Sequence, residues 1–455
     1  MKIDTDREAA YKALLAIERE GSYSNLELSK LLNGDEILNK GFIREIVYGV
    51  IENKIYIDYI LDKFIKKGAH KTKLQALIIL RMGVYQILFM NSVPNYAAVN
   101  ESVALTRRFA KGMDGFINGV LRNFIRNMDS AKNVDVPGRL EYLSIRYSCR
   151  IELVEELVNM LGFEHTKLLL EHAGKRPTLS IRVNKAKISV EELAERLRAK
   201  GFDTQDSKLS DRVLIVKGGA LTETNEYKEG LFSIQSEESC AIADFADAKS
   251  AELVIDLCAA PGGKTAAMAE QMLKASNMNE SRTVTESSAE SGKVIALEIY
   301  EHRSALIEAT SRRLGLDNIE VKCHDATKRI DELVGKADLV LADVPCSGLG
   351  VIRRKPEIKY RDEFDFDELV EIQKNILETG SSYVKYGGKL VYSTCTVNPI
   401  ENERIIENFL ARHDDFISEK EIKLSPFANG YDGFYMNKLK KVEGRVPNGC
   451  GVQDR

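Results

Sequence analysis

Hydrophobic residues return at three- and four-residue intervals through the first part of the chain, as they do in helices that bury one face. Ile43, Ile46, Val47 and Val50 are one example within residues 5–127. Turn-forming residues interrupt this pattern at Gly34-Asp35, Gly68 and Val93-Pro94-Asn95. We therefore predict an all-helical domain over residues 1–130.

The pattern changes to short strand-like runs in the middle of the chain. Leu179–Val183 and Val213–Val216 have the hydrophobic, β-branched character of strands, and a helical pattern from about Val190 to Lys200 lies between them. These runs predict a small α+β module, which a linker joins to the helical domain within residues 131–235.

From Gly230 onward, strands alternate with helices, which is the arrangement of a doubly wound, mostly parallel sheet. We predict this α/β domain over residues 236–441. Residues 276–292 interrupt it with Ser, Glu, Asn and Thr, and bury too little hydrophobic surface to offset their ordering entropy. They are predicted to form a mobile surface insertion, and residues 442–455 a loose tail.

Composition narrows the class of protein. Hydrophobic residues make up 44% and charged residues 29%, as in globular proteins that dissolve in water. No hydrophobic run approaches the length of a membrane span, and the sequence after Met1 lacks a secretory signal, so we expect a cytoplasmic protein without membrane contact. The seven cysteines have no paired metal-ligand spacing, so we expect neither a disulfide framework nor a metal.

Charge is distributed unevenly. The formal net charge is −4, but residues 1–127 contain 19 Lys and Arg against 14 Asp and Glu, a balance of +5. Five lysines gather around one break in the helical pattern: Lys63, Lys66, Lys67, Lys71 and Lys73. Such a cluster suits RNA phosphates, although a solvated lysine face that keeps the protein soluble explains it equally well.

A glycine-containing turn follows the predicted strand Val254–Leu257. Cys258–Thr265 leads from this strand into a helix predicted over Ala266–Leu273. Paired glycines allow the backbone to approach a ligand closely, and a helix start offers unpaired N–H donors. The spacing of a phosphate-binding P-loop is missing, because Ala260 and Pro261 precede the glycines.

An acid about twenty residues beyond such a turn, at the end of the next strand, binds ribose hydroxyls in related folds. Glu298 ends the predicted strand Val294–Glu298 and lies 36 positions after Gly262, or 36 − 17 = 19 without the predicted insertion. A third strand ends at Asp325, where a carboxylate can hold an adenine amino group. The alternative for either residue is an ordinary acid in solvent.

Two cysteines follow the fourth and fifth predicted strands. Ala337–Ala342 leads to Asp343 and Cys346, and Gly388–Ser393 leads to Cys395. The carboxyl ends of parallel strands meet at one edge of a sheet, so both thiols and the carboxylate are expected to face the cofactor crevice. A single cysteine at a strand end more often serves as a small buried hydrophobic residue. Two cysteines at one edge of the sheet favour a catalytic role.

Paired thiols suit methylation of cytosine at carbon 5. This carbon is too weak a nucleophile to attack a methyl sulfonium unaided, and addition of a thiolate to carbon 6 makes the ring electron-rich. Carbon 5 must afterwards lose its proton and the thioether must leave, which requires acid and base groups nearby. Asp343 and Cys346 are candidates, but residue type alone does not assign the two cysteine roles.

Three motifs together resemble the NOL1/NOP2/Sun family of RNA cytosine methyltransferases: Asp256–Thr265, Asp343–Gly348 and Ser393–Thr396. The helical front resembles the antitermination protein NusB, and its stretch Gly115–Arg122 resembles the corresponding family segment. Asp432–Tyr435 resembles the closing strand. The resemblance covers nearly the whole chain, is closest to the bacterial Sun or RsmB type, and implies a Rossmann-like domain with a mostly parallel seven-stranded sheet.

The resemblance also implies residue roles. Cys395 would be the nucleophile and Cys346 the thiol that assists product release, while Lys264 and Asp343 reach towards the reacting base. S-adenosylmethionine would contact the following residues: Cys258, Ala259, Ala260, Pro261, Gly262, Gly263, Lys264, Glu298, Arg303, Asp325 and Asp343. The family usually has Asp in place of Glu298, and often Asp in place of Ser236.

The implied function is methylation of carbon 5 of a 16S rRNA cytosine, at the 967-type site, by a monomer that acts before the ribosomal subunit is fully assembled. Two alternatives remain open at this point. A DNA cytosine methyltransferase would rely on Cys346 alone, and an RNA-binding assembly factor would contain an inert methyltransferase domain.

Overall fold

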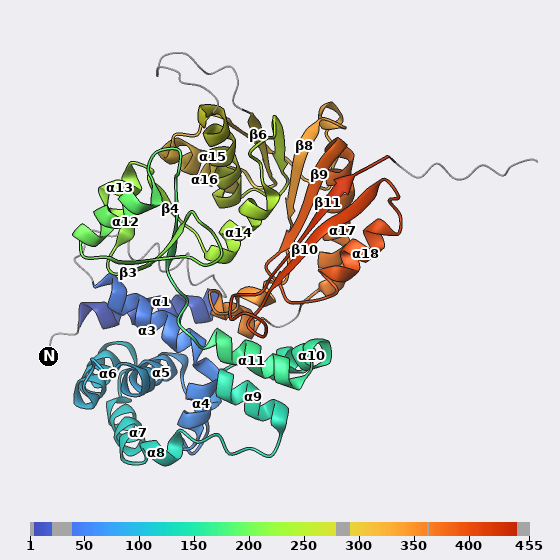
Figure 1. Ribbon diagram of the computed structural model, residues 1–455. Helices are drawn as coiled ribbons and strands as arrows, with labels where there is room; N and C mark the ends of the chain where they lie inside the picture. Colours follow the sequence, from blue (N-terminus) through green and yellow to red (C-terminus); the bar gives the residue numbers. More distant parts are fainter. Residues whose placement is uncertain (1–3, 21–38, 279–291, 362–363, 444–455) are drawn as a thin grey trace, which may run out of the picture. The chain divides into compact units, whose positions relative to one another are not determined.

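The computed structural model describes residues 4–20, 39–278, 292–361 and 364–443 (Figure 1). The predicted turn at Gly34-Asp35, most of the predicted insertion and nearly all of the predicted tail lie outside these ranges. The chain divides into two compact units. The first comprises residues 1–175 and 352–363, and the second comprises residues 176–351 and 364–455.

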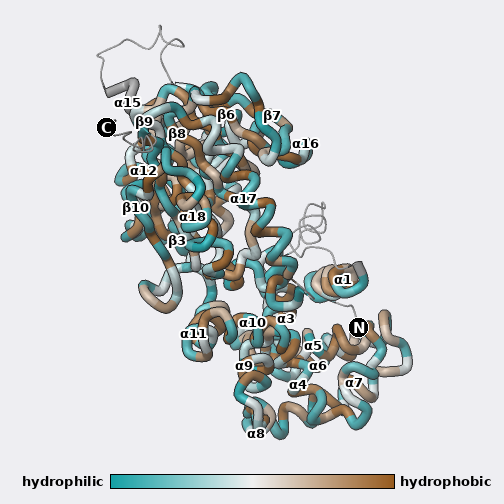
Figure 2. Tube along the Cα trace, turned by 90° about the vertical axis from the view of Figure 1, so that its right-hand side faces the viewer, coloured by the Kyte–Doolittle hydropathy of each residue, from teal (hydrophilic) through white to brown (hydrophobic). Residues whose placement is uncertain are grey.

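The first unit is helical, as predicted for residues 1–130. Its helices are α1 (Thr5–Glu20), α3 (Lys40–Glu52), α4 (Lys54–Asp62), α5 (Leu74–Phe89), α6 (Asn95–Phe109), α7 (Asp114–Arg126), α8 (Met128–Ala131), α9 (Arg139–Tyr147), α10 (Ile151–Leu161) and α11 (Phe163–Ala173), with the 3-10 turn η1 (Ala69–Lys71). This unit also takes in residues 131–175, which were predicted as part of the linker and α+β module but form the helices α9, α10 and α11. Helix α5 packs against α1, α3, α4, α6 and α7 and is buried from Ala76 to Gln86. Its hydrophobic sequence appears brown in Figure 2. A helix without a polar face is expected at the centre of a bundle.

A segment from much later in the sequence completes the helical unit. The 3-10 turn η5 (Pro356–Tyr360) contacts α3, and the buried Lys359 Nζ donates hydrogen bonds to the carbonyls of Glu52 and Tyr147 at 2.7 and 3.0 Å. Burial lowers the pKa of Lys359. Because Lys359 reaches carbonyl groups near the ends of α3 and α9, it satisfies acceptors that a helix end leaves unpaired.

The α+β module contains an antiparallel four-stranded sheet in the second unit. Its strands are β1 (Ser180–Val183), β2 (Asp203–Asp206), β3 (Val213–Lys217) and β4 (Phe232–Ile234), in the order β2-β3-β1-β4. The helices α12 (Val190–Ala199) and α13 (Asn225–Lys228) complete it, with Ile181, Leu197 and Phe232 in the core. The hydrophobic strands were predicted, whereas β2 is a polar edge strand that leaves no hydrophobic pattern.

The seven-stranded sheet follows the predicted mostly parallel arrangement. Its strands are β5 (Leu253–Asp256), β6 (Lys293–Glu298), β7 (Ile319–Cys323), β8 (Ala337–Asp343), β9 (Val384–Thr394), β10 (Phe416–Leu424) and β11 (Phe434–Lys441). The order is β10-β11-β9-β8-β5-β6-β7, and the β11 pairings with β9 and β10 are antiparallel. The chain runs outward from β5 to β6 and β7 on one side and from β8 to β9 on the other, so the order reverses between β5 and β8, the point where such sheets bind ligands.

Helices cover both faces of this sheet (Figure 1). Helices α14 (Glu237–Ala246), α15 (Gly263–Met278) and α16 (Glu301–Leu314) cover one face, and α17 (Phe366–Tyr383) and α18 (Glu403–Leu410) cover the other. No helix in the described ranges combines the length and hydrophobicity needed to cross a lipid bilayer.

Helix α15 corrects one boundary. The predicted helix ended at Leu273, but α15 continues to Met278, into the segment predicted as a mobile insertion from Ser276. No glycine or proline breaks the sequence after Leu273, so the helix has no reason to stop there. Gly292 at the other end is held by Asn318 Nδ2, which donates a hydrogen bond to its carbonyl at 3.2 Å. The predicted mobility concerns residues 279–291, which lie outside the described ranges.

Candidate active site

The turn after β5 is fixed by backbone hydrogen bonds to the strands on either side. The Leu257 N–H donates to the Leu341 carbonyl of β8, and the Ala259 N–H donates to the Leu297 carbonyl of β6, both at 2.9 Å. Gly262 has φ +100°, and a Cβ there would lie 3.1 Å from Ile307 Cα of α16. Only glycine fits this conformation and this close approach to α16. The turn therefore delivers the chain into α15 with its N-terminal N–H groups exposed to a ligand.

A pocket lies at this turn. Its lining comprises Ile234, Gln235, Ser239, Asp256, Cys258, Ala259, Ala260, Pro261, Gly263, Lys264 and Asp343. The sequence predicted the turn residues and Asp343, and it missed the contribution of Gln235 and Ser239 from the segment that joins the two sheets. Neither residue belongs to a recognisable motif.

Lys264 and Asp343 form an ion pair in this pocket. The distance from Lys264 Nζ to Asp343 Oδ2 is 2.6 Å, and Ser393 Oγ donates a hydrogen bond to Asp343 Oδ1 at 2.8 Å. Burial by itself lowers the pKa of Lys264, but the charge and hydrogen bond of Asp343 outweigh it, so the pKa of Lys264 is raised. Lys264 therefore keeps its charge, and the ion pair lies at the end of β8.

The two cysteines lie in contact. Asp343 of β8 pairs with Ser393 of β9, and a few residues beyond this pair the Sγ atoms of Cys346 and Cys395 are 3.3 Å apart. The Cys395 backbone N–H also donates to Cys346 Sγ at 3.3 Å. The predicted convergence of two thiols at the cofactor edge is confirmed. The hydrogen bond with Cys395, together with burial, raises the pKa of Cys346 well above its usual range.

A buried carboxylate joins the two cysteine loops. Glu401 is fully buried and accepts hydrogen bonds from the backbone N–H and hydroxyl of Ser347 at 2.8 and 2.6 Å. It also accepts from Gln373 Nε2 and Asn398 Nδ2, both at 3.0 Å. Ser347 follows Cys346 directly, and Asn398 lies three residues after Cys395. Glu401 was not predicted, because a single acidic residue in a loop after a strand has no sequence pattern that marks it as part of a site.

Of the remaining predicted residues, Glu298 ends β6, Asp325 follows β7 and Arg303 lies in α16. Glu298 is 3% exposed, and Arg303 donates to Glu298 Oε1 at 3.2 Å and to the Ala260 carbonyl at 3.3 Å. Asp325 Oδ1 accepts hydrogen bonds from the Thr327 N–H and hydroxyl, and these hydrogen bonds lower the pKa of Asp325. These three side chains do not line the pocket at the turn.

The predicted binding residues thus extend from Lys264 in the pocket, past the glycine turn, to Glu298 at the end of β6 and Asp325 after β7. Ser236, the other departure from the family pattern, has a structural role, because its hydroxyl accepts the Ser239 N–H at the start of α14.

Known families match all three parts of the chain. The family model described as 16S rRNA methyltransferase RsmB/F matches residues 244–440, the NusB family model matches residues 4–126, and the RsmF/B-like ferredoxin-like domain model matches residues 153–221. A relative named probable ribosomal RNA small subunit methyltransferase B, from Bacillus subtilis, is 34% identical over 97% of this chain and 100% of its own length. A relative of the same name from Synechocystis is 30% identical over 96% of this chain and 99% of its own length.

Solved structures show the same fold. The chain named PH0851 has a TM-score of 0.76 and 24% identity, over 97% of this chain and 100% of its own length. NSun6 from Pyrococcus horikoshii, solved with SFG, has a TM-score of 0.55 and 21% identity, over 64% of this chain and 97% of its own length.

We predict that Asp256 makes stability fall as pH rises. Asp256 is 1% exposed, and its burial raises the pKa of its carboxyl group above the ordinary value, to about 6. The folded protein therefore holds this proton more tightly than the unfolded chain, so the stabilisation is present below about pH 4 and is lost as pH rises to about 6. Relative to Asp256→Asn, the wild type should lose about 3 kcal/mol across this window. Melting temperatures of both proteins between pH 4.5 and 7.5 measure the effect, and a constant difference would contradict it.

We also predict that Glu401 holds the two sulfur atoms together. Glu401→Ala leaves several buried donors without a partner, so the free energy of unfolding should fall by about 1–3 kcal/mol. Phenylarsine oxide bridges only adjacent thiols, so its affinity for the Cys346–Cys395 pair should also fall. The expected decrease is about tenfold, which corresponds to about 1.4 kcal/mol of binding free energy. Glu407→Ala on the exposed face of α18 is the control. Unchanged arsenical binding in Glu401→Ala would show that Glu401 does not position the thiols.

Proposed function

The chain belongs to the RsmB/F family of 16S rRNA methyltransferases, which is of the NOL1/NOP2/Sun type, and on that basis we propose that it methylates carbon 5 of a cytosine in 16S rRNA. The proposed mechanism is a covalent adduct between a cysteine and carbon 6. The observation that supports it most is the 3.3 Å contact of two sulfur atoms at the edge of the sheet that also holds the glycine turn and the Lys264–Asp343 pair.

S-adenosylmethionine is the proposed cofactor, and it supplies an electrophilic methyl group. The N–H groups at the start of α15 and the turn Cys258–Gly263 would hold its amino-acid part. Glu298 would bind the ribose and Asp325 the adenine amino group, with Arg303 holding the Glu298 carboxylate in place. SFG, bound to the solved NSun6, is an analogue of this cofactor.

Cys395 is the proposed nucleophile. The side-chain hydrogen bond with Cys395 and burial raise the pKa of Cys346, and they outweigh the Cys395 N–H, which lowers it. Cys346 is therefore proposed to keep its proton while Cys395 attacks. The Cys395 thiolate would form a bond to carbon 6, and the electron pair displaced onto carbon 5 would then take the methyl group. The electrons of the broken sulfur–methyl bond would remain on the cofactor sulfur, which leaves as a neutral thioether. Lys264 holds Asp343 through their ion pair, and both are proposed to reach towards the reacting cytosine.

Product release must break the bond that Cys395 formed. Carbon 5 would lose its proton to a base, for which we propose Asp343, the ring double bond would re-form, and the sulfur of Cys395 would leave as a thiolate. Cys346, 3.3 Å from that sulfur, donates a hydrogen bond to it as charge develops. The two cysteines thus have different tasks although they lie side by side.

Trapping of RNA on the protein tests this assignment. Cys346→Ala should accumulate a denaturation-resistant RNA complex, because release is impaired while the adduct still forms, and Cys395→Ala should form none. Electrophoresis under denaturing conditions measures the complex, and Cys323→Ala, at an exposed cysteine, is the control. Trapping by Cys395→Ala in place of Cys346→Ala would reverse the roles, and full activity of Cys395→Ala would favour the DNA-type mechanism.

The substrate is proposed to be the 967-type cytosine of 16S rRNA, before subunit assembly is complete, with the protein acting as a monomer in the cytoplasm. The family name supports ribosomal RNA as the substrate class. The choice of cytosine as the modified base is inferred from the two thiols. An inert scaffold, the alternative from the sequence, would need neither the sulfur contact nor the charged pair beside the turn.

The helical unit is proposed to bind single-stranded RNA in a lysine groove, which we define by Lys66, Lys67, Lys71, Lys73 and Phe116. The groove has a volume of about 560 Å³ and lies between η1 and α7. The four lysines are exposed, and within the described ranges no carboxylate forms an ion pair with them. Phe116 is 37% exposed and offers a stacking surface for a base.

Two further observations refine this groove. Lys63 is excluded from it, because its Nζ donates to the carbonyls of Ala131 and Asn133 at 3.0 and 2.7 Å. Gly115 and Gly119 face the groove from α7, and a Cβ at either position would meet nothing within 4 Å. Glycine inside a helix costs stability, so packing within the chain does not account for these two positions. An open helix face between cations suits an approaching polyanion.

Removing two of these lysines should weaken RNA binding. Lys66→Ala with Lys71→Ala is expected to reduce affinity for a single-stranded 16S rRNA fragment and to lower the salt slope of log K by about 1.4, since each phosphate contact contributes about 0.7. Lys111→Ala with Lys132→Ala makes the same charge change at exposed positions outside the groove. Filter binding at several salt concentrations measures both, and equal slopes for the two double variants would contradict the groove.

A further inference from the structure

Gln235 is a pocket residue that no motif identified. It follows β4, is 9% exposed and lines the pocket at the glycine turn. A Cβ on Gly263, the first residue of α15, would lie 3.3 Å from Gln235 Cδ. The Gln235 amide therefore lies against the start of the helix that would receive the cofactor.

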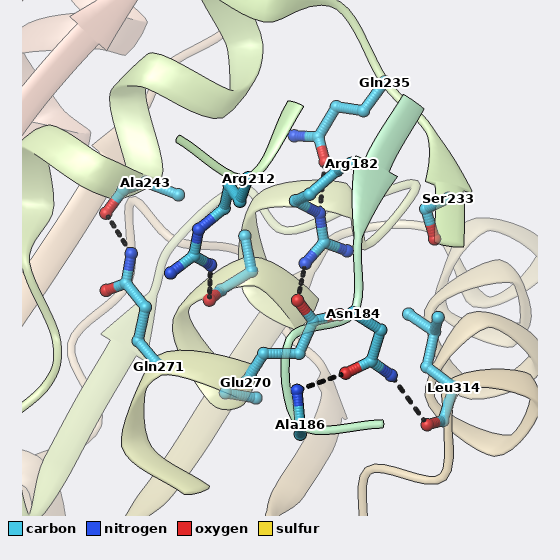
Figure 3. Close-up of polar contacts among 12 residues, drawn as sticks. Arg182, Asn184, Ala186, Arg212, Ser233, Gln235, Ala243, Glu270, Gln271 and Leu314 are labelled. Carbon is cyan, nitrogen blue, oxygen red and sulfur yellow. Dashed lines mark hydrogen bonds and ion pairs between the residues drawn. The ribbon is translucent and has the colours of Figure 1, made fainter. Parts of the chain in front are cut away.

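Arg182 determines which way this amide faces. Arg182 Nε donates a hydrogen bond to Gln235 Oε1 at 2.9 Å (Figure 3). A guanidinium has donors only, so the oxygen of the Gln235 amide must face Arg182 and its nitrogen must face away. Gln235 Nε2 donates one hydrogen to Ser239 Oγ at 3.1 Å, and Ser239 also lines the pocket. A second N–H of the same nitrogen remains for a ligand.

A buried ion pair holds Arg182 in turn. Arg182 is 0% exposed in the middle of β1, and its Nη1 pairs with Glu270 of α15, which is 3% exposed (Figure 3). The pair is neutral overall, so it adds no net charge to the pocket. Its effect is to fix the orientation of the Gln235 amide. Buried ion pairs often add less stability than hydrophobic residues of the same size. Stability alone is therefore a weak reason for a charged residue at the centre of β1.

The pocket residues indicate which part of the cofactor Gln235 faces. The lining includes Lys264 and Asp343, beside the cysteines, and excludes Glu298, the proposed ribose acid. The amino-acid part of S-adenosylmethionine therefore belongs here. Its carboxylate accepts hydrogen bonds, whereas its ammonium only donates them, so an amide N–H suits the carboxylate.

We infer that Gln235 binds the cofactor carboxylate through its amide nitrogen, and that Arg182, held by Glu270, positions this amide from the four-stranded sheet. This inference rests on the proposed cofactor. It gives the small module a role at the cofactor pocket, since β1 supplies the residue that orients Gln235. Gln235 is a binding residue and Arg182 is a positioning residue.

Two ligands separate this role from a structural one. S-adenosylhomocysteine contains the carboxylate, and 5′-methylthioadenosine lacks the whole amino-acid part. Gln235→Ala should weaken S-adenosylhomocysteine about tenfold, as loss of a hydrogen bond to a charged group does, and leave 5′-methylthioadenosine unchanged. Gln235→Glu should weaken S-adenosylhomocysteine further, because it places a negative charge beside the ligand carboxylate. Titration calorimetry measures each dissociation constant.

Arg182→Met should reproduce the selective loss, because the amide is then free to turn. Arg212→Met is the matched control, since Arg212 is also buried and pairs with Asp244, while the hydrogen bond drawn for it in Figure 3 goes to a backbone carbonyl and not to Gln235. It should leave the ratio of the two dissociation constants at the wild-type value. If Arg182→Met fails to fold, the two Gln235 variants carry the test.

The outcomes distinguish the inference from the proposed function. If wild-type protein binds neither ligand, the cofactor proposal is wrong. If the wild type binds both ligands and Gln235→Ala weakens them equally or not at all, the cofactor stands and the inference about Gln235 is wrong. If Gln235→Ala is selective but Arg182→Met is not, Gln235 binds the carboxylate without orientation by Arg182, which overturns the positioning role.

Discussion

Parallel pairing of β5, β8 and β9 is the constraint on which the rest of the site depends. Because these strands run in the same direction, their carboxyl ends meet at one edge, and the pairing of Asp343 with Ser393 sets the loops that follow in register. The glycine turn, the Lys264–Asp343 pair and both sulfur atoms then gather at that edge. A sheet of different strand direction would place the two cysteines at opposite ends.

Register brings the loops together, but buried polar groups fix their final geometry. Glu401 links the loop after β8 to the loop after β9, and Asp343 accepts from Ser393 while it pairs with Lys264. Such groups are expensive to bury and become favourable only when their hydrogen bonds are made. The charged and polar residues around the thiols therefore hold the two cysteine loops in position. The raised pKa of Cys346 follows from its hydrogen bond with Cys395 and from burial.

Local sequence patterns predicted the parts that depend on chain direction and periodicity. The parallel strands, the glycine turn, and the convergence of Cys346 and Cys395 followed from hydrophobic runs and from the rule that strand ends share an edge. Gln235, Glu401 and Lys359 could not be predicted in this way, because each acts through a contact with residues distant in sequence. Lys63 belonged to a predicted basic cluster, yet local carbonyls hold it, which charge counting does not reveal. Helix α15 ends at Met278 and not at the predicted Leu273, because polar residues without a glycine or proline do not stop a helix.

The central claim is that Cys395, beside Cys346 at the cofactor edge, makes 5-methylcytosine in 16S rRNA. Bisulfite sequencing of 16S rRNA after incubation with the protein and S-adenosylmethionine tests it most directly, because methylation at carbon 5 protects cytosine from conversion. We expect one protected cytosine, at the 967-type site, with wild-type protein, and none with Cys395→Ala. Complete conversion with the wild type, or the same protected cytosine with Cys395→Ala, would contradict it.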